Sequence, residues 1–85
     1  MRDEKLYLKV LSGSKNVTFI DFVKLLNAFG FYLDRIKGSH HIFKNKNAPE
    51  LINIQNVNGK VKPYQIKQFL AVVENNNLRL EKTNE

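Results

Sequence analysis

The 85-residue chain contains no cysteine and no tryptophan. Without thiols it cannot form a disulfide framework, a thiolate zinc site or a cysteine nucleophile. No window approaches the roughly 18 consecutive apolar residues of a membrane helix, and residues 1–5 mix charges instead of leading into a signal-peptide core. We therefore expect a cytoplasmic protein with no membrane partner. A chain of this length forms one domain with a shallow surface site, because it is too small for an enclosed cofactor pocket.

Acidic residues are scarce in one part of the chain. Between Arg35 and Lys67 there are seven basic residues and one acidic residue, Glu50, so this segment accounts for the whole net charge of +6. A binding surface for a polyanion needs such an excess. A solvated, lysine-rich surface that keeps the protein soluble is the alternative explanation.

The spacing of apolar residues predicts three helices. Residues 3–11 are expected to form a short amphipathic helix that packs on the body of the protein. Thr18, with Asp21 three residues later, predicts the start of a second helix, whose phenylalanine-rich stripe is expected in the core and which ends at Gly30. The third helix is predicted from Pro63 to Glu74.

Three strands are expected between the second and third helices, at residues 31–36, 40–44 and 51–55, with residues 45–50 as a loop. In the last strand Ile52 and Ile54 alternate with polar residues and are predicted to face inward. This order predicts an α+β fold: a three-stranded antiparallel sheet, covered on one face by two main helices and open to solvent on the other, with an extra N-terminal helix.

The central stretch, residues 35–44, contains both histidines. Gly38 can adopt the positive φ that a three-residue hairpin loop at 37–39 needs, and Ser39 can hydrogen-bond to its own backbone. Because side chains alternate along a strand, His41 shares a face with Phe43, and His40 shares the opposite face with Ile42. With Ile42 buried, we expect His41 on the open face of the sheet, within reach of neighbouring basic residues.

The two histidines favour metal-free chemistry. His40 and His41 point to opposite faces and carboxylates are not clustered, so no metal site is expected. RNA cleavage needs no metal, because the 2′-hydroxyl is a nucleophile already held beside its phosphate. Histidine can accept the hydroxyl proton near neutral pH, and a cation can stabilise the charge that develops on the phosphorus oxygens. The candidate cations, chosen by nearness in sequence, are Lys37, Lys44 and Arg35.

Other roles stay open for several of these residues. The acid that protonates the leaving oxygen could be water, a lysine or Tyr64. His41 could instead be a strand histidine that only stacks or hydrogen-bonds, and His40 is expected to be a packed or rim residue. Phe43 could equally stack on a base or be buried. No acidic residue is placed to make Ser39 a nucleophile.

The chain resembles a known family in three places. Gly38-Ser39-His40-His41-Ile42-Phe43, preceded by Leu25-Leu26 and Gly30-Phe31 and followed by Val61-Lys62-Pro63, is similar to the HicA (YcfA-like) mRNA interferase toxins over Thr18 to Val73. The resemblance implies a fold like the double-stranded-RNA-binding domain (α-β-β-β-α), cleavage of mRNA without a known metal requirement, and a HicB-type antitoxin as partner. The family's catalytic histidine, the last residue of Gly-Ser-x-His, corresponds to His41.

Three features differ from the family's common pattern. Residues 1–17 extend beyond the compact members, the third strand supplies no second histidine, and Tyr64-Gln65 replace a small Gly-Thr. The resemblance therefore divides the chain into an N-terminal helical extension (1–17), a HicA-like domain (18–75) and a C-terminal tail (76–85).

The sequence thus predicts the toxin of a type II toxin–antitoxin system, a metal-independent endoribonuclease with His41 as general base. The residues expected to bind RNA or its phosphates are Arg35, Lys37, Gly38, Ser39, Lys44, Lys60 and Lys62. One alternative is a non-catalytic RNA-binding module of the same fold. Another is an interaction domain whose open sheet face docks a protein.

Overall fold

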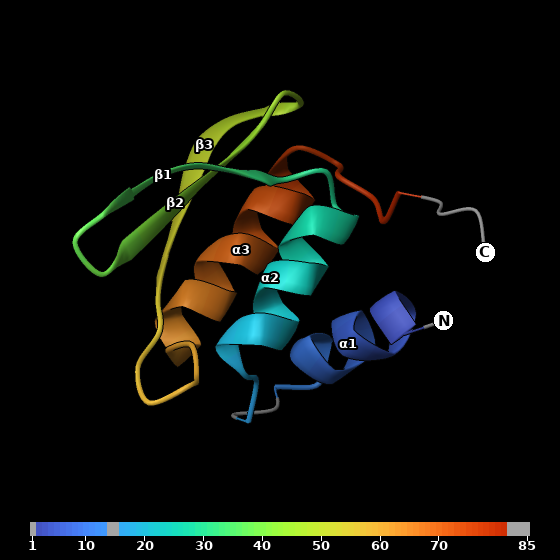
Figure 1. Cartoon of the computed structure of the whole chain (residues 1–85). Coiled ribbons are helices and arrows are strands. Elements are labelled where there is room, and N and C mark those ends of the chain that lie inside the picture. The colour runs from blue at the N-terminus through green and yellow to red at the C-terminus, as the bar shows by residue number, and fades with distance from the viewer. Residues whose placement is uncertain (1, 14–15, 82–85) are drawn as a thin grey trace.

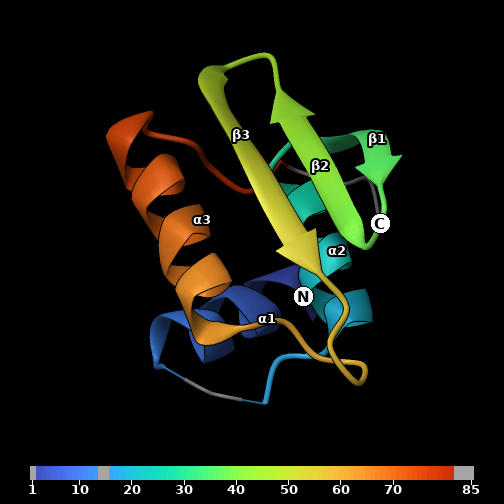
Figure 2. The same cartoon turned by 90° about the vertical axis from the view of Figure 1, so that its left-hand side faces the viewer.

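The computed structural model describes residues 2–13 and 16–81. In chain order, the helices and strands are α1 (Arg2–Leu11), α2 (Phe19–Ala28), β1 (Tyr32–Lys37), β2 (His40–Asn45), β3 (Ala48–Gln55) and α3 (Pro63–Asn75). The three strands form one antiparallel sheet in the order β1-β2-β3. Helices α2 and α3 lie on one face of this sheet and leave the other face uncovered (Figures 1 and 2). The predicted α+β architecture is confirmed.

Both hairpin turns are tighter than the sequence suggested. Lys37 pairs with His40, so the β1–β2 turn contains only Gly38 and Ser39, and Gly38 adopts a φ of +62°. A two-residue hairpin turn with glycine in its first position matches the twist of the flanking strands. The β2–β3 turn is equally short, because Asn45 pairs with Ala48. The predicted three-residue loop at 37–39 and the predicted loop at 45–50 are therefore both wrong.

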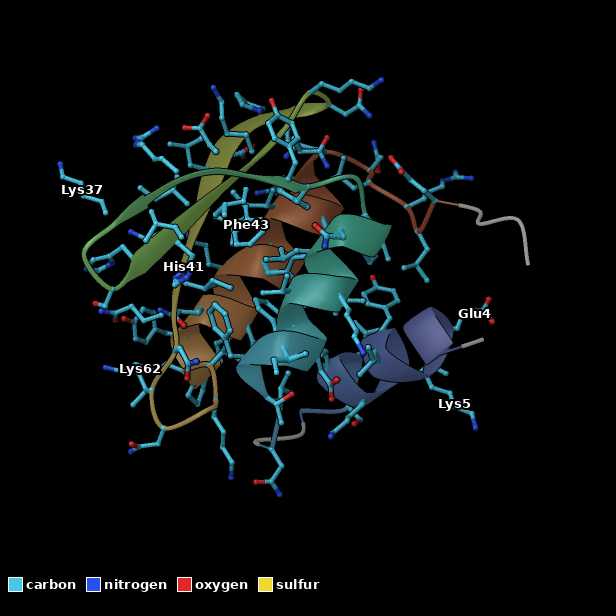
Figure 3. The ribbon with its side chains drawn as sticks, in the orientation of Figure 1. Glu4, Lys5, Lys37, His41, Phe43 and Lys62 are labelled. Atoms are coloured by element: carbon cyan, nitrogen blue, oxygen red, sulfur yellow. The ribbon has the colours of Figure 1, made fainter. Side chains whose placement is uncertain are left out.

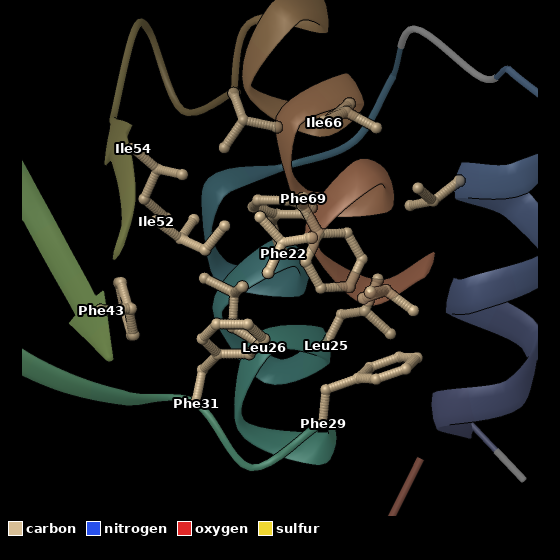
Figure 4. Close-up of a cluster of buried hydrophobic side chains, with 14 of the residues drawn as sticks. Phe22, Leu25, Leu26, Phe29, Phe31, Phe43, Ile52, Ile54, Ile66 and Phe69 are labelled. Carbon is tan, nitrogen blue, oxygen red and sulfur yellow. The ribbon is translucent and has the colours of Figure 1, made fainter. Parts of the chain in front are cut away.

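The hydrophobic core lies between the sheet and the helices. Ile52 and Ile54 of β3 are fully buried, as predicted, and they face Phe22, Leu26 and Phe69 across the interior (Figure 4). The Phe69 ring stands edge-on to Phe22, with the centroids 5.2 Å apart, and to Phe29, at 5.4 Å. Such edge-to-face pairs add to the free energy gained by burying the rings.

The N-terminal helix belongs to the same core. Val10 of α1 is only 2 % exposed, and the Tyr7 ring packs edge-on against Phe29 with the centroids 5.0 Å apart. After α3, Leu78 and Leu80 are partly buried against the core, and the Glu81 amide donates to the Ala28 carbonyl at 2.7 Å. The two ends of the described chain therefore pack beside the C-terminal half of α2.

A buried asparagine anchors the end of β2. The side-chain amide of Asn45 donates to the Phe29 carbonyl at 2.9 Å, and its oxygen accepts from the Asn47 amide at 2.8 Å. These bonds satisfy a polar group that is otherwise surrounded by the core. Among the described helices, none is both long and apolar enough to cross a bilayer.

We expect Phe69→Ala to lower the free energy of unfolding by about 3–5 kcal/mol, because it empties the centre of the aromatic cluster. Leu8→Ala, on the exposed face of α1, is the control and should change stability by less than about 0.5 kcal/mol. Urea unfolding followed by circular dichroism measures both values. Equal effects of the two substitutions would contradict the described core.

Candidate active site

The sheet presents His41 on the face that packs against the helices. In the register of the sheet, His41 lies opposite Ile36 on β1 and Ile54 on β3. Ile54 and Phe43 both belong to the core, and Phe43 is only 3 % exposed. Because alternate residues share a face, His41 lies on their side of the sheet. Figure 3 shows His41 extending from the hairpin toward the helices and Lys37 extending away from them.

The predicted face of His41 was therefore wrong. The prediction took Ile42 as the inward residue of β2, but Ile42 is buried on the outer face and is not part of the core cluster. Ile42 and Phe43 are adjacent in β2 and both are apolar, so alternation alone did not decide which of them faces the helices. The core packing of Phe43 also settles its role: its ring is not available to stack on a base.

His41 is nevertheless not deep in the interior. Its ring packs edge-on against Phe19, the first residue of α2, with the centroids 4.9 Å apart, and the side chain is only partly buried. Strand β1 covers this end poorly, since Ile36, opposite His41, is 55 % exposed. Nδ1 of His41 is buried and has no hydrogen-bond partner among residues 2–13 and 16–81. The other ring nitrogen, Nε2, is not buried in this way.

The loop between β3 and α3 runs beside Phe19. The Phe19 amide donates to the Gly59 carbonyl at 2.8 Å, and the Val61 amide donates to the Val17 carbonyl at 3.3 Å. Two candidate cations belong to this loop. Lys60 pairs with Thr18 in an isolated bridge, and its Nζ donates to Asn16 Oδ1 at 3.2 Å, whereas Lys62 is the N-cap residue of α3. The backbone of this loop therefore lies at the α2 end where His41 packs, and its lysine ammonium groups lie beside Asn16 and Tyr64.

The other candidate cations lie on the opposite face. Lys37 is opposite His40, and Arg35 is opposite Ile42, so both side chains belong to the outer face of the sheet. Lys44 shares that face, because it is two residues from Ile42. The Asp34 carboxylate pairs with Arg35 and lies 3.8 Å from the Lys44 Nζ. Nearness in sequence was thus the wrong criterion: none of these three cations shares the face of His41.

The remaining residues of the motif hold the hairpin in place. The Ser39 hydroxyl accepts a hydrogen bond from Gln55 Nε2 at 3.0 Å, which ties the turn to the end of β3. His40 is exposed on the outer face, where its Nδ1 lies 3.0 Å from Asn53 Oδ1. Tyr64, the candidate acid, is 60 % exposed in the first turn of α3, and the Lys62 Nζ lies 6.0 Å from its ring centroid. Tyr64 lines a pocket with His40 and not with His41.

Sequence reasoning missed Phe19 as the neighbour of His41 and did not recognise that Lys60 and Lys62 belong to the loop beside Phe19. Both facts depend on contacts between residues far apart in the sequence. No group of three histidine, aspartate or glutamate side chains within residues 2–13 and 16–81 is arranged to hold a metal ion.

Comparison with known proteins identifies one family. The family model described as the HicA toxin of bacterial toxin–antitoxin systems matches residues 20–74, which cover α2 after Phe19, the whole sheet and α3 up to Glu74. No curated protein and no solved structure matches the chain. The matched region contains His41 and the loop with Lys60 and Lys62, and α1 lies outside it.

We expect Phe19→Ala to shift the proton resonances of the His41 ring, because the substitution removes the ring that packs edge-on against it. The loss of this aromatic pair should also lower the free energy of unfolding by about 1 kcal/mol, in addition to the effect of lost burial. Ile20→Ala is the matched control, since the neighbouring Ile20 side chain is exposed. Two-dimensional NMR compares the variants; unchanged His41 signals in Phe19→Ala would contradict the described contact.

Proposed function

Because the chain belongs to the HicA toxin family of bacterial toxin–antitoxin systems, we propose that it is an endoribonuclease that cleaves mRNA without a metal ion, with His41 as general base. The observation that supports this most is the position of His41. It combines a partly buried imidazole, one accessible nitrogen and a neighbouring loop with two lysines.

In the proposed reaction, Nε2 of His41 accepts the proton of a ribose 2′-hydroxyl as its oxygen attacks the adjacent phosphorus. The bond from phosphorus to the 5′-oxygen breaks, and that oxygen takes up a proton. The products are a 2′,3′-cyclic phosphate and a 5′-hydroxyl. The attack is fast for an intramolecular reason, because the 2′-hydroxyl and the phosphorus belong to the same nucleotide. A well-placed general base raises the rate by a further factor of roughly 10² to 10⁴. Water or a lysine supplies the proton to the leaving oxygen, because Tyr64 lines a pocket with His40 and not with His41.

The environment of Nδ1 sets a limit on this base. For Nε2 to act as the acceptor, the neutral ring must carry its hydrogen on Nδ1, which is buried without a partner among the described residues. An unpaired buried donor costs about 1–3 kcal/mol. Unlike the histidine of a catalytic triad, His41 has no carboxylate among the described residues to offset this cost. We therefore expect a slow nuclease.

The basic residues divide into two groups. Lys60 and Lys62 lie on the loop beside Phe19 and are proposed to stabilise charge on the phosphate that reacts at His41. Three residues on the outer face are proposed to bind other phosphates of the RNA, not the one that reacts: Arg35, Lys37 and Lys44. Gly38 and Ser39 form the turn between the two groups.

The family membership also implies an antitoxin, for which we propose a HicB-type protein acting in the same cytoplasm. An RNA-binding module without catalysis would use the same lysines, and a protein-docking domain would use the open face of the sheet. The experiments below separate these functions, because only the nuclease needs His41 for its effect on RNA.

We expect His41→Gln and His41→Ala to abolish RNA cleavage by the purified protein and growth arrest on induction in a bacterium. The glutamine variant can still pack against Phe19 but cannot act as a base, so its loss of activity separates catalysis from packing. Thermal unfolding confirms that both variants fold. If either variant cleaved RNA in the presence of a chelator as fast as the protein with His41 does, the assignment of His41 would be refuted.

We expect the two groups of lysines to affect different steps. Lys62→Ala should lower the single-turnover cleavage rate about tenfold or more, because it removes charge beside the reacting phosphate. Lys37→Ala should leave this rate nearly unchanged and reduce the slope of log affinity against log salt by about 0.7, as expected for one lost phosphate contact on a single strand. Lys5→Ala on α1 is the control for net charge. Equal rate losses for Lys37→Ala and Lys62→Ala would contradict the division.

A further inference from the structure

A polar pocket lies on the other side of the same end of the sheet. Its volume is about 270 Å³, and its lining comes from β2, β3 and the first turns of α3: His40, Asn53, Gln55, Tyr64, Gln65 and Gln68. We propose that this pocket is a base-recognition subsite, which binds one unpaired base of the RNA by its hydrogen-bonding edge. The proposal rests on the proposed function for the identity of the ligand.

Among the residues that the structure describes, the lining contains amide groups and no charged side chain of lysine, arginine, aspartate or glutamate. This composition is unusual for its position, because the sheet and loop around it hold most of the excess basic residues. A phosphate or a metal ion would require charged partners, whereas asparagine and glutamine match the paired donor and acceptor groups on base edges. The chemistry of the pocket therefore favours an uncharged, planar, hydrogen-bonding group.

Gln65 has a fixed orientation in this pocket. Its Oε1 accepts from the Lys62 amide at 3.2 Å and from the Gln55 amide at 3.4 Å, and the residue is only 2 % exposed. Since both backbone donors face the oxygen, the NH₂ group is the end left for a ligand. A preoriented donor costs little ordering entropy when it binds, and it discriminates between bases that offer an acceptor and bases that do not.

Two further side chains are held by neighbours. Asn53 Oδ1 lies 3.0 Å from His40 Nδ1, and Gln55 Nε2 donates to Ser39 Oγ at 3.0 Å. Each amide thus has one end engaged within the protein, and its other end makes no hydrogen bond to the described part of the chain. Gln68, exposed on α3, adds a side chain that can both donate and accept. The pocket therefore offers several hydrogen-bonding groups whose positions are set before the ligand arrives.

Tyr64 provides the flat surface that base recognition usually requires. Its ring is 60 % exposed at the border of the pocket, and the Lys62 Nζ lies 6.0 Å from the ring centroid. A base stacked on Tyr64 would carry its phosphate toward Lys62 and the loop beside Phe19. The volume is below the roughly 300–1,000 Å³ of sites for drug-sized ligands, which suits a single base.

The pocket and the candidate active site flank one strand. His40 lines the pocket from the outer face of β2, and the next residue, His41, points to the inner face. A single strand of RNA that passes over this end of the sheet near Lys62 would contact both the pocket and His41. The base bound in the pocket would then determine which phosphate reaches His41. Cleavage is therefore expected to depend on the identity of the base a fixed number of nucleotides from the broken bond.

The test uses RNA that cannot be cleaved. Tetramers of 2′-O-methyl A, C or U, whose nucleophile is blocked, are titrated into the ¹⁵N-labelled full chain, and the side-chain NH₂ signals are followed by NMR. We expect the signals of Gln65 and Gln68 to shift and the affinities for the best and worst tetramer to differ by about fivefold or more. Gln68→Leu and Asn53→Ala should reduce this difference to within about twofold.

Two controls complete the design. Asn27→Leu replaces an exposed amide near the C-terminal end of α2 and should preserve the ranking of the tetramers. Tyr64→Ala should weaken all three about fivefold or more, because stacking accepts any base. Amide signals that do not move, or a ranking that survives both Gln68→Leu and Asn53→Ala, would overturn the proposal. Base-dependent shifts in a protein that leaves ordinary RNA intact would support the subsite and refute the nuclease.

Discussion

The packing of one face of the sheet against α2 and α3 is the constraint on which the candidate site depends. Phe43, Ile52 and Ile54 are buried there, and strand alternation then places His41 on the same face. Phe19 packs against one side of the imidazole. All residues of β1 are exposed, so this end of the sheet stays open to solvent. The same hydrophobic packing that stabilises the domain therefore buries one nitrogen of His41 and leaves the other accessible. A small protein can position a reactive side chain in this way without an enclosed cavity.

Charge is divided by the sheet into two surfaces with different consequences. On the outer face, Asp34 pairs with Arg35 and approaches Lys44, so part of the positive charge is compensated locally. Around the β3–α3 loop, Lys60 and Lys62 are placed by backbone hydrogen bonds between residues 17–19 and 59–61. Between these surfaces, the described lining of the polar pocket carries no side chain of lysine, arginine, aspartate or glutamate. The arrangement suits a strand of RNA that follows the end of the sheet, with phosphates on both sides and a base between them.

Much of the fold could be predicted from the sequence, because helix caps, apolar spacing and the inward positions of Ile52 and Ile54 are local signals. His41 was chosen as the candidate catalytic residue from its motif, and this role stays a prediction. Its face was not, because residues 45–50 were taken as a loop, which left the β2–β3 register undefined. A two-residue turn at Lys46 and Asn47 would have set odd-numbered residues of β2 opposite even-numbered residues of β3, and so placed Phe43 and His41 on the same face as the buried isoleucines. Asp34 lies one residue before the basic segment, so the charge count over residues 35–67 did not include it. Its carboxylate partly neutralises Arg35 and Lys44. The contact between Phe19 and His41 joins residues 22 positions apart, and no local pattern signals it.

The central claim is that the 2′-hydroxyl of RNA attacks its own phosphate at His41, and the chemical ends of the cleaved RNA test it most directly. A labelled transcript is incubated with the purified protein in a chelator, and the fragments are analysed by mass spectrometry. The account predicts a 2′,3′-cyclic phosphate on one fragment and a 5′-hydroxyl on the other. Fragments with a 3′-hydroxyl and a 5′-phosphate would contradict it, because those ends arise when water attacks the phosphorus in place of the ribose.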